Sequence, residues 1–374
     1  MSNINDYINW RGDLSFVRDP VNMIDCLLLA QLSYMRWELI WQPGMMTTLA
    51  NLFPRFDEKE FSITFTAKYD RIMLPLAAKS RRFGSVLLSD FVYCFDEAAE
   101  EQFSAVTFHL PDNSLFIAFR GTDCTLVGWR EDFKIACKPE VPAQAHAAEY
   151  LAMIAGRYKG RIRIAGHSKG GNLAVYAAAT ASQAIQDRLL DVCNFDGPGQ
   201  QPSLFASPGY QRISRLHTLV PVSSIIGMLL CHPEKLDIVK SDASSIYQHN
   251  PYSWQLCGTS FLTAENRNSD SHYFEKVFED WLKEISLDER TSFVDTVFDV
   301  LASTKARTFG SDLFQNLIQH PKEFLSSISN VNKDSWQNVI KVIRTLASSA
   351  VEKGFSMSPA VALPKPEDSS FIDE

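Results

Sequence analysis

The sequence predicts a protein of the α/β class, built on a mostly parallel sheet and followed by a helical C-terminal extension. Short apolar and β-branched segments alternate with helical patterns between residues 103 and 256, as is typical of parallel strands joined by helices. A serine flanked by glycines, in the segment 166–170, stands between an expected strand and an expected helix. After residue 270 the apolar residues recur at helical spacing alone.

Length and composition favour one large core with an appendage. The chain has 374 residues, of which 45% are hydrophobic and 21% are charged, the balance of a globular protein. We expect residues 1–285 to form the main domain, including an N-terminal helical region, and residues 286–356 to form the helical extension. Residues 357–374 are polar and rich in proline, so we expect a disordered tail with little to bury.

Charge and cysteine usage exclude several classes of partner. The net charge is −8 and no basic block is present, so nucleic acid is not an expected partner. The start of the chain lacks a secretory signal, and no run reaches the ~20 apolar residues that span a bilayer. We therefore expect a cytoplasmic protein without a transmembrane segment.

The seven cysteines include no CxxC pair, so we expect reduced thiols and neither metal nor cofactor.

The first 260 residues carry the expected strands and their helices. An apolar stretch at 23–39 has helical spacing, and the rest of the first hundred residues carries only weak signals. Two apolar runs, 103–110 and 114–121, are separated by a Pro-Asp-Asn turn, which predicts a hairpin. Helices are expected at 147–154 and 172–181. Later strands are expected at 161–166, 191–195, 215–220 and 236–240.

Three helices are expected beyond residue 270. The first carries an apolar stripe within 274–282. Ser286 and Glu289 can form a capping box that begins the second, whose apolar residues lie between 294 and 301. The third is indicated by apolar residues at helical spacing within 336–343.

The motif G-x-S-x-G at residues 166–170 predicts a nucleophile elbow, which points to the α/β-hydrolase fold. In such a turn a side chain two residues before or after the serine would clash with neighbouring elements, so glycine is required there. Ser168 is the predicted nucleophile. The competing interpretation is a flexible turn or a phosphate-binding loop, although the pattern of a P-loop is absent.

The predicted elbow also supplies part of an oxyanion hole. The backbone N–H of Lys169 lies at the start of the helix that follows the serine, where it can face a developing negative charge. A second donor should come from a loop after an earlier strand, and Phe-Arg-Gly-Thr ends the expected hairpin at residues 119–122. The pairing of this segment with Gly-His-Ser-Lys-Gly-Gly resembles the class 3 (fungal-type) lipases, and by that resemblance Thr122 is the second donor.

A closer resemblance is to a bacterial domain-of-unknown-function family of lipase-like α/β hydrolases, and it covers residues 6–278. It implies the fold and the nucleophile but no substrate. Within it, Trp129 and Asp132 either hold the loop that carries Thr122 or act directly in catalysis. The motifs that carry the resemblance are YINWRGDLSF, FRGTDCTLVGWREDF, GHSKGGNLAVYAA, NFDGPG and YQHNPYSW.

A serine nucleophile needs a histidine base, and in this fold the base follows the serine and the acid in the chain. His217 lies within an expected strand and His232 follows an apolar stretch, so both favour structural roles. His249 is the preferred base because it lies in a polar loop soon after the last expected strand. His272 is the alternative, since class 3 lipases place their base further along the chain.

Asp196 is the expected acid, because it ends the strand at 191–195 and can reach over the sheet edge to an imidazole. Class 3 lipases carry the acid in Asp-x-Val-Pro after the next strand, whereas this chain has Thr-Leu-Val-Pro at 218–221. Asp237 and Asp242 are the alternative candidates for the acid. The structural alternative for Asp196 itself is a buried aspartate that caps a helix.

Two hypotheses of function follow. The first is a serine hydrolase that forms an acyl-enzyme and cleaves carboxylic esters, with a small ester or acyl compound, lipids included, as its substrate. The apolar run 225–230 would line an acyl pocket or lid, or else form a buried helix. The second is a catalytically silent protein of the same fold, which binds a partner through its C-terminal helices.

Overall fold

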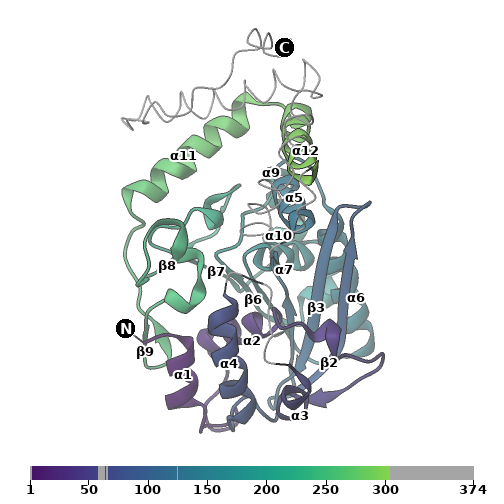
Figure 1. The fold of residues 1–374 in the computed structure, drawn as a ribbon, viewed down its shortest axis with the longest axis vertical. Helices are drawn as coiled ribbons and strands as arrows, with labels where there is room; N and C mark the ends of the chain where they lie inside the picture. The colour runs from purple at the N-terminus through teal and green to yellow at the C-terminus, as the bar shows by residue number, and fades with distance from the viewer. Residues whose placement is uncertain (1, 58–63, 65, 124, 304–374) are drawn as a thin grey trace, which may run out of the picture.

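The computed structural model describes residues 2–57, 64, 66–123 and 125–303. An eight-stranded sheet runs through the molecule, with its strands in chain order from β1 to β8 and helices on both faces (Figure 1). Strands β1 to β4 pair in antiparallel fashion, and β4 to β8 are parallel. The strands are β1 (Thr47–Thr48), β2 (Leu87–Asp96), β3 (Glu101–His109), β4 (Leu115–Phe119), β5 (Ile162–His167), β6 (Leu189–Phe195), β7 (Leu216–Pro221) and β8 (Leu236–Val239), and a separate pair comprises β9 (Leu256–Cys257) and β10 (Ser260–Phe261).

The predicted hairpin and the predicted parallel strands are confirmed. Phe119 of β4 pairs with Gly166 of β5, and Phe195 of β6 pairs with Leu219 of β7. In this register the carboxyl ends of β4, β5 and β6 meet at one edge of the sheet. Ligands and reacting groups of parallel α/β sheets lie at this edge, and Ser168 and Asp196 follow β5 and β6 there.

Helices flank the sheet and extend beyond one end of it. Figure 1 shows the last two helices at the end of the molecule opposite the first, third and fourth. They are α1 (Ile4–Arg11), α2 (Met23–Leu32), α3 (Leu49–Leu52), α4 (Ala67–Lys79), α5 (Leu126–Ile135), α6 (Pro142–Arg157), α7 (Lys169–Thr180), α8 (Gln183–Gln186), α9 (Pro202–Phe205), α10 (Pro208–Gln211), α11 (Ser269–Glu284) and α12 (Leu287–Ser303), with 3-10 turns η1 (Trp37–Leu39), η2 (Phe53–Arg55), η3 (Ile226–Met228), η4 (Ser245–His249) and η5 (Pro251–Ser253). Among the described residues, no helix combines the length and apolarity that crossing a bilayer requires.

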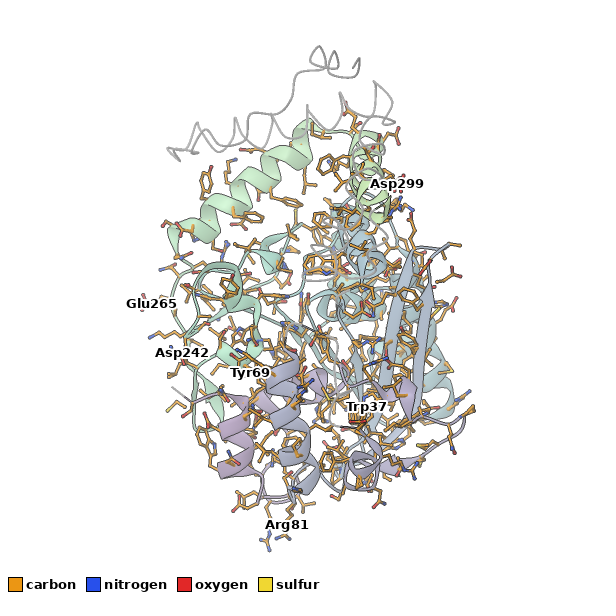
Figure 2. The ribbon with its side chains drawn as sticks, viewed as in Figure 1. Trp37, Tyr69, Arg81, Asp242, Glu265 and Asp299 are labelled. Carbon is orange, nitrogen blue, oxygen red and sulfur yellow. The ribbon has the colours of Figure 1, made fainter. Side chains whose placement is uncertain are left out.

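The expectation of one helix over 23–39 was wrong in its length, because α2 ends at Leu32. The Ser33 hydroxyl donates to the carbonyl of Ala30 at 2.6 Å, and the buried Trp37 indole donates to the carbonyl of Leu32 at 2.9 Å. These bonds satisfy carbonyls that a longer helix would have used. Trp37 lies inside the molecule (Figure 2).

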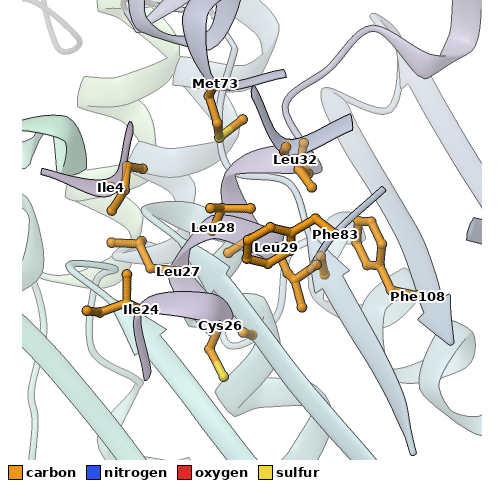
Figure 3. Close-up of a cluster of buried hydrophobic side chains, with 14 of the residues drawn as sticks. Ile4, Ile24, Cys26, Leu27, Leu28, Leu29, Leu32, Met73, Phe83 and Phe108 are labelled. Atoms are coloured by element: carbon orange, nitrogen blue, oxygen red, sulfur yellow. The ribbon is translucent and has the colours of Figure 1, made fainter. Parts of the chain in front are cut away.

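Helix α2 fills one face of the sheet. Ile24 through Leu32 are all buried, so the helix has no solvent side. Leu27, Leu28 and Leu29 belong to a cluster that also holds Phe83 and Phe108 (Figure 3). Burial of this kind stabilises the fold by about 1.5–3 kcal/mol for each large apolar side chain.

Helices α6 and α7 cover the opposite face. Along β5, Ile162 and Ile164 point to the cluster formed with these helices, while Ala165, the next residue, points to the α2 side. Successive side chains of a strand alternate between faces, so both layers are packed by one strand. The small apolar residues of α7 allow its close approach to the sheet.

A buried ion pair joins the helices of the first hundred residues, a region for which the sequence carried only weak signals. The guanidinium of Arg82 contacts Asp25 through Nε at 2.7 Å and through Nη2 at 2.5 Å, and all of these atoms are buried. The hydroxyl of Tyr7 donates to Asp25 at 2.9 Å. The Asp25 carboxylate of α2 therefore holds both helix α1 and the turn after α4.

The helical character predicted beyond residue 270 is confirmed for α11 and α12. Ser286 and Glu289 form the predicted capping box, with each backbone N–H bonded to the other side chain. Arg130 of α5 donates to Asp295 and Asp299 of α12, whose Asp299 side chain lies at the outer surface (Figure 2). The helix expected at 336–343 and the tail expected at 357–374 lie outside the described residues.

Candidate active site

Ser168 stands on the sharp turn between β5 and α7, as predicted. Its φ of 58° and ψ of −135° lie in a region that side chains rarely adopt. Such a backbone conformation costs about 1–3 kcal/mol and persists only where the surroundings enforce it. The conformation projects the serine hydroxyl from the strand end, over the first turn of the helix.

The two glycines of the motif are required by close backbone contacts, as the sequence predicted. A Cβ on Gly166 would lie 2.1 Å from the carbonyl carbon of Gly170, and a Cβ on Gly170 would lie 2.2 Å from the carbonyl oxygen of Phe119. Both distances are far below van der Waals contact. No side chain fits at either position while the turn and the end of β4 stay in place.

The structure brings Ser168, His249 and Asp196 into one hydrogen-bonded chain. His249 Nε2 lies 3.0 Å from Ser168 Oγ, and His249 Nδ1 lies 2.7 Å from Asp196 Oδ2. An ionised carboxylate only accepts hydrogen bonds, so Nδ1 carries the proton and Nε2 accepts from the serine hydroxyl. This tautomer is the one that a general base beside a serine needs.

The Asp196 carboxylate is fully buried and fixed from several directions. Its backbone N–H donates to the carbonyl of Leu219 at 2.8 Å, which anchors it to β7. Its Oδ1 accepts from the hydroxyl of Ser224 at 2.5 Å. A Cβ on Gly227 would lie 2.3 Å from the same oxygen, so η3 packs directly over the acid. The sequence carried no signal for Ser224 as a partner of Asp196.

His249 ends the short turn η4, and its neighbours hold that turn in place. Gln248 accepts from the Ser223 N–H at 2.8 Å and donates to the carbonyl of Ala243 at 3.0 Å. The buried Trp254 indole donates to the carbonyl of Gln248 at 2.8 Å. The polar segment YQHNPYSW therefore forms a fixed support for the imidazole.

His167 and Tyr34 support the imidazole from behind, and sequence reasoning missed both. His167 Nε2 donates to the carbonyl of His249 at 2.9 Å, and its Nδ1 lies 3.2 Å from the hydroxyl of Tyr34. Burial, with a further contribution from His249, lowers the pKa of His167 well below its ordinary value. The ring is therefore neutral at pH 7. His167 precedes the serine in the motif and could have been suspected; Tyr34 had no signal.

The other candidate residues lie elsewhere. His272 is on α11, exposed, and its Nδ1 lies 3.3 Å from Arg267. His217 contacts Asp191, and His232 contacts Glu234 and the carbonyl of Gly227. The two substitute acids also have other partners, since Asp237 faces Lys235 and Asp242 accepts from Gln255.

The candidate oxyanion donors flank the same turn. The Lys169 N–H is the first of α7, and the first N–H groups of a helix have no partner within it. A Cβ on Gly121 would lie 2.5 Å from the carbonyl oxygen of His167, so the loop before Thr122 contacts the elbow. The Thr122 hydroxyl donates to Asp132 of α5, which holds this loop.

The Lys169 side chain is fully buried and all three of its donors are used. Its Nζ lies 2.7 Å from the carbonyl of Gln102, 3.0 Å from the Gln102 side-chain oxygen and 2.9 Å from Glu131 Oε2. Glu131 in turn accepts from the backbone N–H groups of Gln102 and Ala143. Burial acts to lower the pKa of Lys169, but Glu131 and Asp132 outweigh it and raise the pKa. The ammonium group thus ties the elbow to β3 and α5.

Asp132 carries a perturbed carboxyl group beside Thr122. Burial raises its pKa to about 6, although Lys169 and the hydrogen bond from Thr122 act to lower it. Its side chain is half-buried. The same carboxyl has a pKa of about 3.9 in an unfolded chain, so its ionisation opposes folding. This contribution disfavours the folded state increasingly as the pH rises from about 4 to about 6, is constant at higher pH, and vanishes below the unfolded pKa.

We expect Asp132→Asn to raise the free energy of unfolding by about 1–2 kcal/mol at pH 8, because the amide keeps an acceptor for Thr122 and removes the ionisation. The difference in the free energy of unfolding between the variant and the unaltered chain should shrink by more than half at pH 4.5, where the native carboxyl is protonated. Urea denaturation of both proteins at the two pH values measures it. A difference that does not change with pH would contradict this account.

The apolar run 225–230 forms the short turn η3 rather than a longer helix. Gly227, Met228 and Leu230 are buried, while Ile225 and Ile226 are half-buried. Because Gly227 packs against Asp196, this segment screens the acid from water.

Comparison with known protein families identifies a match over most of the described part of the chain. A model of the Mbeg1-like family, a family recognised as lipase-like, matches residues 77–299, more than half of the chain. The matched range contains the elbow, the Thr122 loop and the η4 turn. No curated protein and no solved structure matches the chain.

Proposed function

The chain belongs to the Mbeg1-like family, and we propose that it is a serine hydrolase that cleaves carboxylic esters through Ser168, His249 and Asp196. The observation that carries the proposal is the chain of hydrogen bonds, 3.0 Å from Ser168 to His249 and 2.7 Å from His249 to Asp196. These distances are within the range of a nucleophile, its base and the acid that orients the base.

In the proposed reaction Ser168 Oγ attacks the ester carbonyl while His249 Nε2 takes the hydroxyl proton. Asp196 stabilises the resulting imidazolium through Nδ1 and stays ionised. His249 then gives the proton to the leaving alcohol, which leaves an acyl group on Ser168. A water molecule, deprotonated by the same Nε2, hydrolyses this acyl-enzyme and restores the serine.

The tetrahedral intermediate places a negative charge on the former carbonyl oxygen. We assign its stabilisation to the backbone N–H groups of Lys169 and Thr122. Each such donor accounts for about 3–4 kcal/mol of transition-state stabilisation in hydrolases of this kind. Support comes from the position of Lys169 at the start of α7 and from the contact between Gly121 and the elbow.

A fluorophosphonate probe tests whether Ser168 is activated, because such probes phosphonylate a serine only where a base and an oxyanion hole assist. We expect stoichiometric labelling of the full chain and hydrolysis of short p-nitrophenyl esters. Ser168→Ala should lose both. Ser203→Ala, a change at an exposed serine, is the matched control and should retain both.

Failure of the unaltered chain to react with the probe, with its fold intact by circular dichroism, would overturn the proposal. The protein would then be a silent member of the fold that acts by binding. Labelling of the Ser168→Ala variant would mean that another serine reacts.

A further inference from the structure

A cluster of three metal-ligating side chains lies away from the proposed active site. Cys94 is on β2, Glu101 is on β3, and His146 is on α6. Their donor atoms, one sulfur, one carboxylate oxygen and one imidazole nitrogen, all lie within 4.8 Å of one another. The three come from separate elements, so the fold itself assembles the cluster.

The carboxylate of Glu101 is at the centre of the cluster. Its side chain is only 6% exposed, whereas that of His146 is 42% exposed. The thiol of Cys94 lies 3.5 Å from Glu101 Oε2, and His146 Nδ1 contacts Oε1. A buried carboxylate requires compensation by opposite charge or by hydrogen bonds. A cation held between the three groups would supply it.

We propose that Cys94, Glu101 and His146 bind one zinc ion. Thiolate, imidazole and carboxylate together form a donor set that suits zinc, while magnesium prefers oxygen ligands alone. Three protein ligands leave the fourth tetrahedral position for water, and the exposure of His146 gives the ion a path from solvent. Zinc bonds of about 2.0–2.3 Å in a tetrahedron place the ligand atoms roughly 3.3–3.8 Å from one another, and the 3.5 Å between Cys94 Sγ and Glu101 Oε2 lies in that range.

The bound ion would join the β2–β3 hairpin to α6. Gln102, which follows Glu101, is the residue whose carbonyl and side chain hold Lys169 beneath the elbow. The proposed zinc would thus fix the strand end on which the Lys169 contacts depend. The inference does not rest on the proposed hydrolase activity.

Cobalt substitution tests the site without any assay of activity. The full chain, reduced and freed of metal by a chelator, is titrated with Co²⁺, whose bond to a thiolate gives a near-ultraviolet charge-transfer band. We expect one equivalent to bind, the band to appear, and Zn²⁺ to abolish it by displacement. Mg²⁺ at the same concentration should leave it unchanged.

Cys94→Ser should remove the band, and His146→Gln should weaken Co²⁺ and Zn²⁺ binding by at least about tenfold. Cys257→Ser, a change at an exposed cysteine on β9, is the matched control and should bind like the unaltered chain. Circular dichroism shows whether the variants fold. Absence of the band in the unaltered chain, or its persistence in Cys94→Ser, overturns the proposal and leaves Glu101 as the hydrogen-bond partner of His146.

Discussion

Replacing His249 by alanine is expected to lower kcat for short p-nitrophenyl esters by a factor of about 10³ or more. His249 Nε2 lies 3.0 Å from Ser168 Oγ, so its removal leaves the hydroxyl without a base. The serine is then an ordinary alcohol at neutral pH. Initial rates at saturating substrate measure the effect, and near-ultraviolet circular dichroism shows that packing is retained.

His272→Ala is the control for this prediction. His272 lies on α11 and contacts Arg267, so its loss should change kcat by less than about twofold. The reverse outcome, a large loss in His272→Ala and a mild one in His249→Ala, would show that the wrong histidine has been assigned and that Asp196 is not the acid.

Replacing Lys169 by methionine is expected to lower the free energy of unfolding by about 3–5 kcal/mol. Methionine has a similar length but cannot compensate the carboxylate of Glu131, which is 1% exposed. The change also leaves the carbonyl and side-chain oxygen of Gln102 without their donor. Both are buried, and unsatisfied buried acceptors are costly. Urea denaturation, monitored by tryptophan fluorescence, measures the loss.

A double-variant cycle separates the ion pair from simple loss of packing. The variant that combines Glu131→Gln with Lys169→Met removes both charges together. Its free energy of unfolding should fall by at least about 1 kcal/mol less than the sum of the decreases in the two single variants. Lys235→Met, at a side chain that is 90% exposed, should change stability by less than about 0.5 kcal/mol. If the decreases in the free energy of unfolding from the changes at Lys169 and Glu131 are additive, the two side chains are not directly coupled.

Some features were predictable because they depend on local sterics and on chain order. The elbow needs glycine at 166 and 170 for backbone clearance, so the motif alone gave the turn and the orientation of Ser168. The hairpin and four later strands were predictable from runs of apolar residues. Strand β2 was not, because a bulge after Ser89 and a positive φ at Asp90 interrupt its alternation.

The apolar stretch at 23–39 predicted a helix where α2 begins, but it did not predict where that helix ends. Helix α2 is buried on all sides, so it lacks the one-sided apolar stripe that marks the limits of most surface helices. Its end at Leu32 depends on Trp37 donating to a carbonyl across a turn. This hydrogen bond forms only after the chain turns back at residues 33–37, so the sequence pattern did not predict it.

What the sequence by itself determined was the α/β class, the places of most strands along the chain and the position of Ser168 on its turn, because each depends on neighbours close in the chain. Only the tertiary structure decided that His249 rather than His272 lies beside Ser168 and that Asp196 lies behind it. It also placed Lys169 on Glu131 and brought Cys94 and His146 to the same carboxylate, that of Glu101. Lys169 and Glu131, like Cys94 and His146, are separated by tens of residues, and strand pairing and helix packing bring them together.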